Sequence, residues 1–434
     1  MNRFFITSLL LLMSSLAIAQ SFITVEGTDF IRNGKPYHFL GTNFWYGINL
    51  AHQGDGGGRE RLLRELDRLQ ALGVDNLRIM GASEGPDGSP WRMAPALQMA
   101  PGQYNEGLWD ALDFLLAEMS KRQMAAVVCL SNFWPWSGGM AQYVAWAEGS
   151  TIPYPPPAEG GNWLAYMLYS ARFYKNQTAK AAYFAHLEKL INRTNTYSGV
   201  PYKEDPTIMA WQLANEPRGM FSAGKYRKWI KTSARFIKRL DPNHLVCIGS
   251  EGNTQTPTGN HFKKDHRFPE IDYTTIHIWI QNWQWYDPQQ PDKTYDKALQ
   301  KATNYINRHL VIAEKLHKPM VLEEFGIARD YDNYADTAST LWRDRYYRDV
   351  FEIVSQLARQ GSSMAGVNFW AWGGEGRPRA PKAVWQPGDD FIGDPPHEYQ
   401  GWYSVYDADV STLEVIREYC QKLRQVSEKK QDGI

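Results

Sequence analysis

The sequence predicts an α/β fold: a single (β/α)8 TIM barrel with a short N-terminal hairpin and long loops at one end. Eight short apolar segments of strand length recur along the chain, and amphipathic segments of helical length separate most of them, a pattern typical of this barrel. The 434 residues suffice for one large barrel, and no Pro/Ser-rich linker or low-complexity tract divides them.

The first 19 residues have the pattern of a secretory signal peptide. Arg3 precedes an apolar run at 6–12, and Ala17-Ile18-Ala19 supplies the small residues of a cleavage site. We therefore assign 1–19 to the signal peptide and 20–434 to the barrel domain, and we expect a secreted protein, either extracellular or periplasmic. No cysteine follows the cleavage site to carry a lipid, so we expect no membrane anchor.

The barrel strands are predicted from short runs rich in Val, Ile, Leu and aromatic residues. Ahead of them, residues 22–35 are expected to form a hairpin, because Asn33-Gly34 favours a tight turn. The eight strands are expected at 37–44, 75–80, 125–131, 206–213, 245–249, 273–278, 319–325 and 365–370.

The segments between the strands predict helices and two long loops. Helices are expected at 59–72, 106–122, 178–195, 225–240, 295–316 and 340–360, with a last one at 412–426. The connections 132–163 and 372–402 are unusually long and rich in Pro, Gly and Trp. Both follow strands, so both should rise on the C-terminal face, where such barrels keep their active sites.

The composition favours a neutral substrate. Lys+Arg and Asp+Glu both total 47, so no net field attracts nucleic acid, a membrane or a polyanion. The 17 Trp and 24 Tyr residues suit sugar rings, whose C–H faces stack on aromatic side chains. The alternative is that a large barrel packs many aromatic residues in its core. We expect a neutral polysaccharide partner and a monomeric protein.

The three cysteines do not indicate a disulfide framework or a metal site. Cys129, Cys247 and Cys420 are far apart, and two of them lie in apolar strand-like runs. We interpret them as small buried core residues. The chain has no C-x-x-C pair and no H-E-x-x-H motif, so we expect neither a cofactor nor a catalytic metal.

Carboxylates stand at the ends of two predicted strands. Glu216 follows the fourth strand, and Pro217 biases Glu216 towards extended geometry. The seventh strand closes with Glu323 and Glu324, which strict alternation would place on opposite faces, so only one of them should look into the barrel mouth. The fourth and seventh strands are three apart around the ring, so Glu216 and Glu324 can converge over the barrel axis.

Two carboxylates that face each other across a cleft suit glycoside hydrolysis. One must be protonated to assist the leaving oxygen, while the other is ionised to attack or stabilise the oxocarbenium-like centre. The closeness of like charges, together with partial burial, would keep one of them protonated. The structural alternative is a salt-bridged glutamate at each strand end.

The motifs Asn215-Glu216-Pro217 and Leu322-Glu-Glu324-Phe-Gly326 resemble family 5 of the glycoside hydrolases, specifically its endo-β-1,4-mannanase branch. The resemblance covers nearly the whole chain after residue 19. Further matches are Asn33-Gly34-Lys35-Pro36, Asn76-Leu-Arg78, Gln142-Tyr-Val-Ala-Trp146 and Gly249-Ser-Glu-Gly252.

The resemblance implies a role for each matched residue. It makes Glu216 the acid/base and Glu324 the nucleophile of a retaining mechanism, with Glu323 facing the barrel wall. The two carboxyl groups should then lie about 5–5.5 Å apart. Arg78 would sit beside Glu324 and keep it ionised, and Asn215 would donate to the sugar 2-hydroxyl. For Arg78 the alternative is an ordinary structural ion pair.

Other matched positions are expected to bind substrate. His277 matches a family histidine near the acid/base, although a satisfied core histidine is the alternative. Trp279 stands where many relatives have a Tyr whose hydroxyl contacts the nucleophile, and an indole N–H can donate there but cannot accept. Trp370 would lie under the sugar and Trp134 beside the next subsite. Further candidates are Glu251 as a hydroxyl acceptor, and Trp283, Trp285 and Trp372 as either subsites or plain loop packing.

We therefore expect a secreted, retaining endo-β-1,4-mannanase that acts on mannan, glucomannan or galactomannan. A β-1,4-glucan-active member of the family, an endoglucanase or xyloglucanase, is the second hypothesis, because mannose and glucose differ only in the orientation of one hydroxyl. The third hypothesis is a non-catalytic barrel that only binds polysaccharide, against which the two carboxylates argue. Whether the loops 132–163 and 372–402 block one end of the cleft decides between endo and exo action.

Overall fold

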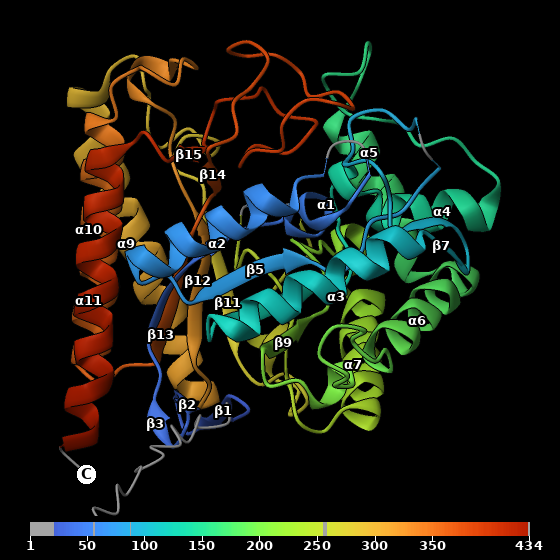
Figure 1. Ribbon diagram of the computed structural model, residues 1–434, viewed down its shortest axis with the longest axis horizontal. Helices are drawn as coiled ribbons and strands as arrows, with labels where there is room; N and C mark the ends of the chain where they lie inside the picture. Colours follow the sequence, from blue (N-terminus) through green and yellow to red (C-terminus); the bar gives the residue numbers. More distant parts are fainter. Residues whose placement is uncertain (1–20, 55–56, 87, 255–257, 433–434) are drawn as a thin grey trace, which may run out of the picture.

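The computed structural model describes residues 21–54, 57–86, 88–254 and 258–432 (Figure 1). The predicted signal peptide lies outside the described residues. Within the described ranges, no helix combines the length and the apolar character that a membrane span requires.

Eight parallel strands form the central barrel, which confirms the predicted fold. They are β4 (Phe39–Asn43), β5 (Asn76–Met80), β8 (Ala125–Cys129), β9 (Ile208–Gln212), β10 (Leu245–Cys247), β11 (Thr274–Ile278), β12 (Met320–Phe325) and β13 (Met364–Phe369). Their order around the ring is β10, β9, β8, β5, β4, β13, β12, β11. Between β10 and β11 the ring closes through backbone hydrogen bonds, such as the Asp272 N–H to the Val246 carbonyl at 2.8 Å.

Helices surround the barrel because each presents an apolar face to the strands. The seven predicted helices occur as α2 (Arg59–Leu72), α3 (Glu106–Lys121), α6 (Gln177–Ile191), α7 (Ala223–Leu240), α9 (Pro291–Leu316), α10 (Leu341–Arg359) and α11 (Val410–Asp432). The long α11 packs along α10 on the outer wall (Figure 1). Shorter helices that the sequence did not indicate lie in the connections: α1 (Gly47–Ala51), α4 (Gly139–Glu148), α5 (Trp163–Ser170) and α8 (Phe262–His266).

A small antiparallel sheet lies at the N-terminal end of the barrel. The segment predicted as a hairpin contains β1 (Thr24–Glu26) and β2 (Asp29–Arg32), which pair through a turn at 27–28, and β2 pairs in turn with β3 (Lys35–Pro36). Asn33 and Gly34 form the turn between β2 and β3 with φ of 53° and 72°, as their sequence predicts. An apolar cluster joins this sheet to the lower barrel interior; its members include Phe30, Tyr37, Phe39, Val127, Met209 and Val321.

The cysteines lie in apolar surroundings, as expected. Cys129 is on β8, Cys247 is on β10 and Cys420 is on α11, and all three are buried and unbridged. Burial raises the pKa of the Cys129 thiol to about 12, so this thiol stays protonated and behaves as a small core residue.

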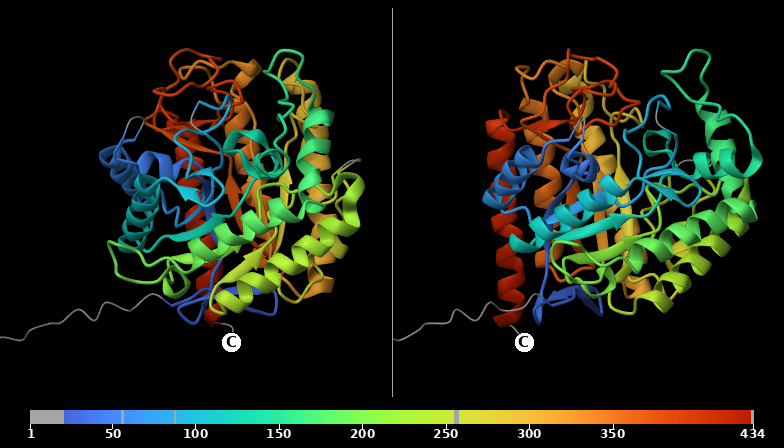
Figure 2. Two further views of the ribbon diagram at one scale, coloured as in Figure 1. Left: turned by 90° about the vertical axis from the view of Figure 1, so that its right-hand side faces the viewer. Right: turned by 45° about the vertical axis from the view of Figure 1, so that its right-hand side comes forward.

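The two long connections rise together on the C-terminal face of the barrel (Figure 2). The first contains α4 and ends where α5 begins. The second contains β14 (Trp372–Gly374), which pairs with β15 (Val405–Tyr406) near the start of α11. This is the face on which the sequence predicted an active site.

Glu84 fastens the first long connection to the barrel. Its backbone N–H donates to the Ser137 carbonyl at 2.7 Å, and its Oε2 accepts the N–H of Gly139 at 2.8 Å, at the start of α4. The side chain is buried, and this burial raises the pKa of Glu84 to about 7. The folded protein therefore holds a proton on Glu84 at pH values where the unfolded chain has lost it.

We predict that Glu84 makes the protein less stable as the pH rises from about 4.5 to about 7, because the folded state binds the extra proton in this window. The contribution amounts to at most about 3 kcal/mol. The Glu84→Gln variant cannot titrate, so its free energy of unfolding should fall less over the same range. Denaturant unfolding at pH 5 and pH 8 measures this, with the exposed Glu60→Gln as control. An unchanged pH dependence in Glu84→Gln would contradict the prediction.

Candidate active site

Glu216 reaches the barrel mouth through an unusual backbone conformation. The strand β9 ends at Gln212, and Glu216 has a left-handed φ of 47°, so the expectation that Pro217 holds it extended is wrong. Its N–H donates to the Gly249 carbonyl at 2.9 Å, which fixes this conformation. A Cβ at position 249 would lie 2.1 Å from the Ala214 carbonyl oxygen, so the approach requires glycine.

Glu324 is positioned by an irregularity in the barrel. The register between β11 and β12 shifts after Ile276, so that His277 pairs with Glu324 and Glu323 has no partner on β11. Both Glu323 and Glu324 therefore contact groups inside the barrel. The prediction that Glu323 faces the barrel wall is wrong, because strict alternation does not hold at the shift.

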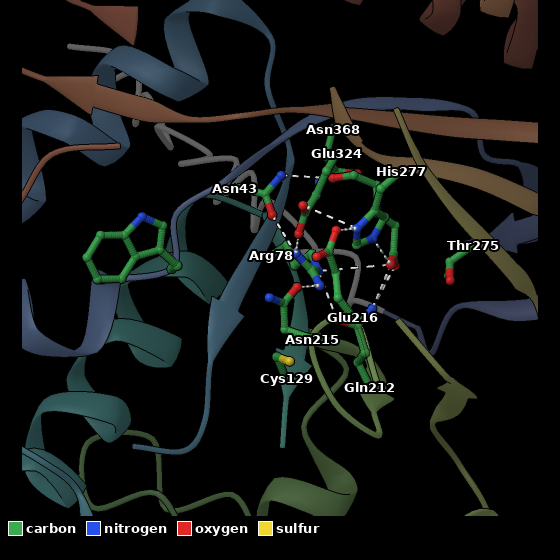
Figure 3. A network of polar contacts seen from close by, with 12 residues as sticks. Asn43, Arg78, Cys129, Gln212, Asn215, Glu216, Thr275, His277, Glu324 and Asn368 are labelled. Atoms are coloured by element: carbon green, nitrogen blue, oxygen red, sulfur yellow. Dashed lines mark hydrogen bonds and ion pairs between the residues drawn. The ribbon is translucent and has the colours of Figure 1, made fainter. Parts of the chain in front are cut away.

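Glu216 and Glu324 face each other around His277 (Figure 3). The His277 Nδ1 lies 2.7 Å from Glu216 Oε1 and 3.2 Å from Glu324 Oε2. One oxygen of each carboxylate lies within 4.8 Å of the other. This upper limit lies below the roughly 6.5–9.5 Å of inverting glycosidases and is compatible with the spacing of about 5–5.5 Å in retaining ones.

Arg78 forms hydrogen bonds with several side chains at the base of the site. It donates to Glu324 in a short charged contact and to the side chains of Gln212 at 2.8 Å, Asn43 at 2.9 Å and Asn215 at 2.7 Å. Arg78 is 5% exposed, so little water screens its contact with Glu324. Its predicted place beside Glu324 is confirmed.

His277 carries a positive charge at this site. Burial by itself lowers the pKa of His277, but the Glu324 carboxylate and the close contacts with Glu216, Glu323 and Glu324 raise it well above its ordinary value. The Nε2 of His277 lies 3.6 Å from Glu323 Oε2. Glu216, His277 and Glu324 have the donor atoms of a metal site, but binding a cation there would require His277 to lose the proton that these carboxylates hold.

Glu323 lies below the site as a third buried carboxylate. Both of its oxygens accept the Gln212 side-chain amide at 2.8 Å, and one lies 3.9 Å from the Arg78 Nε. The sequence had no signal for this contact, because only the register shift brings Glu323 inward. Glu323 thus partners His277 and Arg78 from the side away from the cavity.

A cavity of about 530 Å³ opens above these carboxylates. Trp134, a predicted wall residue, donates its indole N–H to Glu216 Oε2 at 2.6 Å. Trp370 and Trp279 meet edge to face, with ring centroids 5.8 Å apart, and the indole of Trp279 donates no hydrogen bond to Glu324 within the described structure. The residues lining the cavity include the predicted Trp134, Asn215, Glu216, Glu251, Trp279, Trp283, Glu324 and Trp370.

Several predicted binding residues lie differently from expectation, and His277 and Trp285 are not among the residues that line the cavity. Trp372 is fully buried, and its indole N–H donates to Glu65 Oε2 at 3.0 Å, so the prediction that it forms a subsite is wrong. Glu251 lines the cavity, but both of its oxygens accept the Arg218 guanidinium at 2.7 Å. Arg218 in turn lies 4.6 Å from the ring centre of Trp134, and the sequence analysis did not single it out.

The two long connections meet at one side of the cavity. Trp163, at the end of the first connection, and His397, in the second, have ring centroids 5.9 Å apart. Next to His397 lies Glu398; both residues line the cavity, and the His397 Nδ1 and the Glu398 Oε2 are buried without a hydrogen-bond partner. Burial lowers the pKa of His397 to about 3 and raises that of Glu398 well above its ordinary value.

The sequence predicted the two long connections but not which of their residues line the cavity. Pattern and spacing mark the loops as rich in aromatic residues, whereas the contact between Trp163 and His397 depends on how the loops fold over the barrel. The residues that line the cavity beyond those predicted include Trp136, Trp163, Arg218, Asn282, His397, Glu398, Trp402 and Tyr403.

Known proteins share this architecture. A family model described as GH family 5 beta-mannosidase-like matches residues 20–428. The mannan endo-1,4-beta-mannosidase 1 of Solanum lycopersicum is 31% identical over 364 residues, which cover 80% of this chain and 83% of that protein.

Solved structures are similar over nearly the whole chain. The glycoside hydrolase family 5 mannosidase from Rhizomucor miehei superposes with a TM-score of 0.87 and 39% identity, over 94% of this chain and 99% of that one. A mutant of that enzyme has been solved in complex with mannosyl-fructose. The endo-beta-1,4-mannanase from Thermotoga petrophila has a TM-score of 0.66 and 27% identity, over 90% of this chain and 77% of that one.

We predict that Arg78→Lys reduces kcat by at least on the order of 10²-fold, because one ammonium group cannot donate in the directions of Glu324, Asn43, Asn215 and Gln212. The variant should also lower Tm, since buried acceptors lose their donors. Kinetics on a mannan and thermal unfolding measure the two effects. Arg64→Lys, which changes an exposed ion pair, is the control and should leave both nearly unchanged. Full activity in Arg78→Lys would contradict this account.

Proposed function

The chain belongs to the GH family 5 beta-mannosidase-like family, and we propose that it is a retaining endo-β-1,4-mannanase that hydrolyses internal β-1,4-mannosidic bonds of mannan, glucomannan or galactomannan. The observation that carries the proposal is the pair Glu216 and Glu324, with carboxylate oxygens within 4.8 Å of each other, in a cavity rich in tryptophan. A relative named as a mannan endo-1,4-beta-mannosidase supports the substrate class.

The first step forms a covalent intermediate. A Glu324 oxygen attacks the anomeric carbon while the bond from that carbon to the leaving oxygen breaks, and Glu216 gives its proton to the leaving oxygen. Arg78 and His277 orient Glu324, because both contact its carboxylate. The indole N–H of Trp134 donates to Glu216 Oε2, whereas His277 contacts Glu216 Oε1, so both carboxylate oxygens are held in place.

The second step releases the sugar. Glu216, now ionised, takes a proton from a water molecule whose oxygen attacks the anomeric carbon, and the bond to Glu324 breaks. Glu324 leaves as a carboxylate and Glu216 regains its proton, so the site returns to its starting state. Two displacements at one carbon retain the anomeric configuration.

The cavity and the N-terminal sequence support the remaining parts of the proposal. The walls supply tryptophan faces for uncharged sugar rings, and the chain has no net charge to attract a charged polymer. The signal-peptide pattern of residues 1–19 supports export from the cytoplasm, to the medium or the periplasm.

The meeting of the two long connections favours a second candidate, an exo-acting β-mannosidase. Trp163 and His397 contact each other across the two connections, which would limit the cavity on that side, whereas cleavage inside a polymer requires a cleft that is open on both sides of the catalytic centre. The similarity to the Rhizomucor miehei mannosidase supports this candidate. In an exo-acting enzyme, the cavity would bind one end of the polysaccharide, and short units would be cleaved from that end.

A chromatographic product profile on β-1,4-mannohexaose and cellohexaose tests the proposal. We expect cleavage of the mannose hexamer, with products of intermediate length for endo action and loss of single terminal units for exo action. Cleavage of cellohexaose alone would keep the mechanism and assign a glucan substrate instead. Binding of mannohexaose without any product would favour a non-catalytic barrel.

We predict that Glu324→Ala reduces turnover of mannohexaose by several orders of magnitude while leaving Tm close to that of the parent, because the nucleophile is lost and the fold is not. Glu314→Ala, an exposed change on α9, is the matched control and should keep full activity. Near-parental activity in Glu324→Ala would refute the catalytic assignment.

We predict that Trp163→Ala changes the product lengths, because it removes the ring contact that would limit the cavity on that side. The variant should release more products of intermediate length from mannohexaose than the parent does. Trp285→Ala, which alters an aromatic residue outside the cavity lining, is the control. An unchanged product profile in Trp163→Ala would argue against closure by these loops.

A further inference from the structure

Arg218 lies beside the catalytic pair, two residues after Glu216 in the chain. It stands between β9 and the 3-10 turn η4 (Met220–Ser222), and it lines the catalytic cavity. Its side chain is only 16% exposed, and the two displacement steps described above do not use it. Since a guanidinium is costly to bury unless it is paired, its contacts indicate what it does.

A pair of hydrogen bonds fixes the plane of the guanidinium. The Arg218 Nε donates to Glu251 Oε2 and its Nη2 donates to Glu251 Oε1, both at 2.7 Å. Glu251 is itself fixed, because its backbone carbonyl accepts the Tyr305 hydroxyl at 2.8 Å and the His277 backbone N–H at 3.1 Å. A bidentate pair of this kind leaves the guanidinium little freedom, so Arg218 keeps one orientation at the cavity wall.

The fixed guanidinium lies against the ring of Trp134. The Arg218 Cζ is 4.6 Å from the ring centre, which is within the range of cation–π attraction. The backbone N–H of Trp134 donates to Asn132 Oδ1 at 3.0 Å, and the ring of Trp163 is nearly perpendicular to that of Trp134, with centroids 5.6 Å apart. The backbone and the ring of Trp134 are therefore both restrained.

This series of contacts ends at the acid/base. The Trp134 indole N–H donates to Glu216 Oε2 at 2.6 Å, while the His277 Nδ1 lies 2.7 Å from Glu216 Oε1. Burial by itself lowers the pKa of Arg218, but the carboxylates of Glu251 and Glu216 raise it above its ordinary value. The guanidinium and Glu216 are thus close enough to act on each other, although Glu251 takes both hydrogen bonds.

We propose that Arg218 is a positioning residue for the general acid. Together with Glu251 it fixes the ring of Trp134, and the Trp134 N–H then keeps Glu216 in the orientation from which its proton reaches the leaving oxygen. The inference rests on the proposed function, because it requires Glu216 as the acid/base. Since proton transfer depends on a precise approach, Arg218 acts on the protonation of the leaving oxygen and not on the attack by Glu324.

Two kinds of substrate distinguish this role from a merely structural one. In mannohexaose the leaving oxygen belongs to a sugar and requires the proton of Glu216. The 2,4-dinitrophenyl β-glycosides of mannose and mannobiose release a stabilised phenolate, which departs without a proton. For these glycosides kcat/KM reports the attack by Glu324 without the assistance of the acid.

The test variants are Arg218→Gln and the double variant Arg218→Gln/Glu251→Gln, which removes both charges and so leaves no buried carboxylate unpaired. The matched control is Arg227→Gln. It breaks another part-buried ion pair, with Asp265 at 2.8 Å, at a residue of α7 outside the cavity lining. For the full-length parent and each variant, kcat and KM on mannohexaose, kcat/KM on the dinitrophenyl glycosides and Tm are measured.

We expect both test variants to lose at least about tenfold in kcat on mannohexaose, with KM and the kcat/KM on the dinitrophenyl glycosides changed by less than about threefold. The control should keep all of these constants near those of the parent. If Arg218→Gln alone lowers Tm strongly, the double variant decides. If the parent cleaves only mannohexaose, the separation of kcat from KM on that substrate decides.

Three results would overturn the proposal. Equal losses on both kinds of substrate would make the role of Arg218 structural, a raised KM with unchanged kcat would make it substrate binding, and parental kcat in the double variant would give it no role. A parent that hydrolyses neither mannohexaose nor the dinitrophenyl glycosides would instead overturn the proposed function, and this inference with it.

Discussion

The buried charge balance at the barrel mouth is the interaction on which the active site depends. Glu216, Glu323 and Glu324 are all nearly inaccessible to solvent, and the basic side chains of Arg78 and His277 lie between them. Removing ionised groups from water is costly unless each one is paired and hydrogen-bonded. The barrel meets this cost because side chains from β4, β5, β9, β11 and β12 converge on the same point. No single helix or hairpin could bring them together.

Two local departures from regular structure make that convergence possible. A register shift between β11 and β12 turns both Glu323 and Glu324 inward, and a left-handed backbone at Glu216 returns its carboxylate over the axis. Such conformations are held by their surroundings, here by the Gly249 carbonyl, and they concentrate at functional sites. The proposed chemistry requires the resulting short separation of the two carboxylates, since attack and proton transfer take place on one sugar.

The loops around the mouth determine which part of a polymer can reach this chemistry. Tryptophan faces line the cavity, and Trp163 and His397 from the two long connections contact each other at its edge. His397 and Glu398 are partly buried there, and one polar atom of each has no hydrogen-bond partner.

The amino-acid sequence alone determined the barrel, its eight strands and seven of its helices, because apolar periodicity and turn residues are local signals. It also indicated the pair Glu216 and Glu324, since each stands at the end of a predicted strand, and the resemblance to family 5 implied the basic partner Arg78. Only the tertiary structure decided the inward position of Glu323, the burial of Trp372 and the pairing of Glu251 with Arg218. These features arise from a register shift, from packing beneath a loop and from contacts between distant segments, and none of them leaves a periodic pattern in the chain.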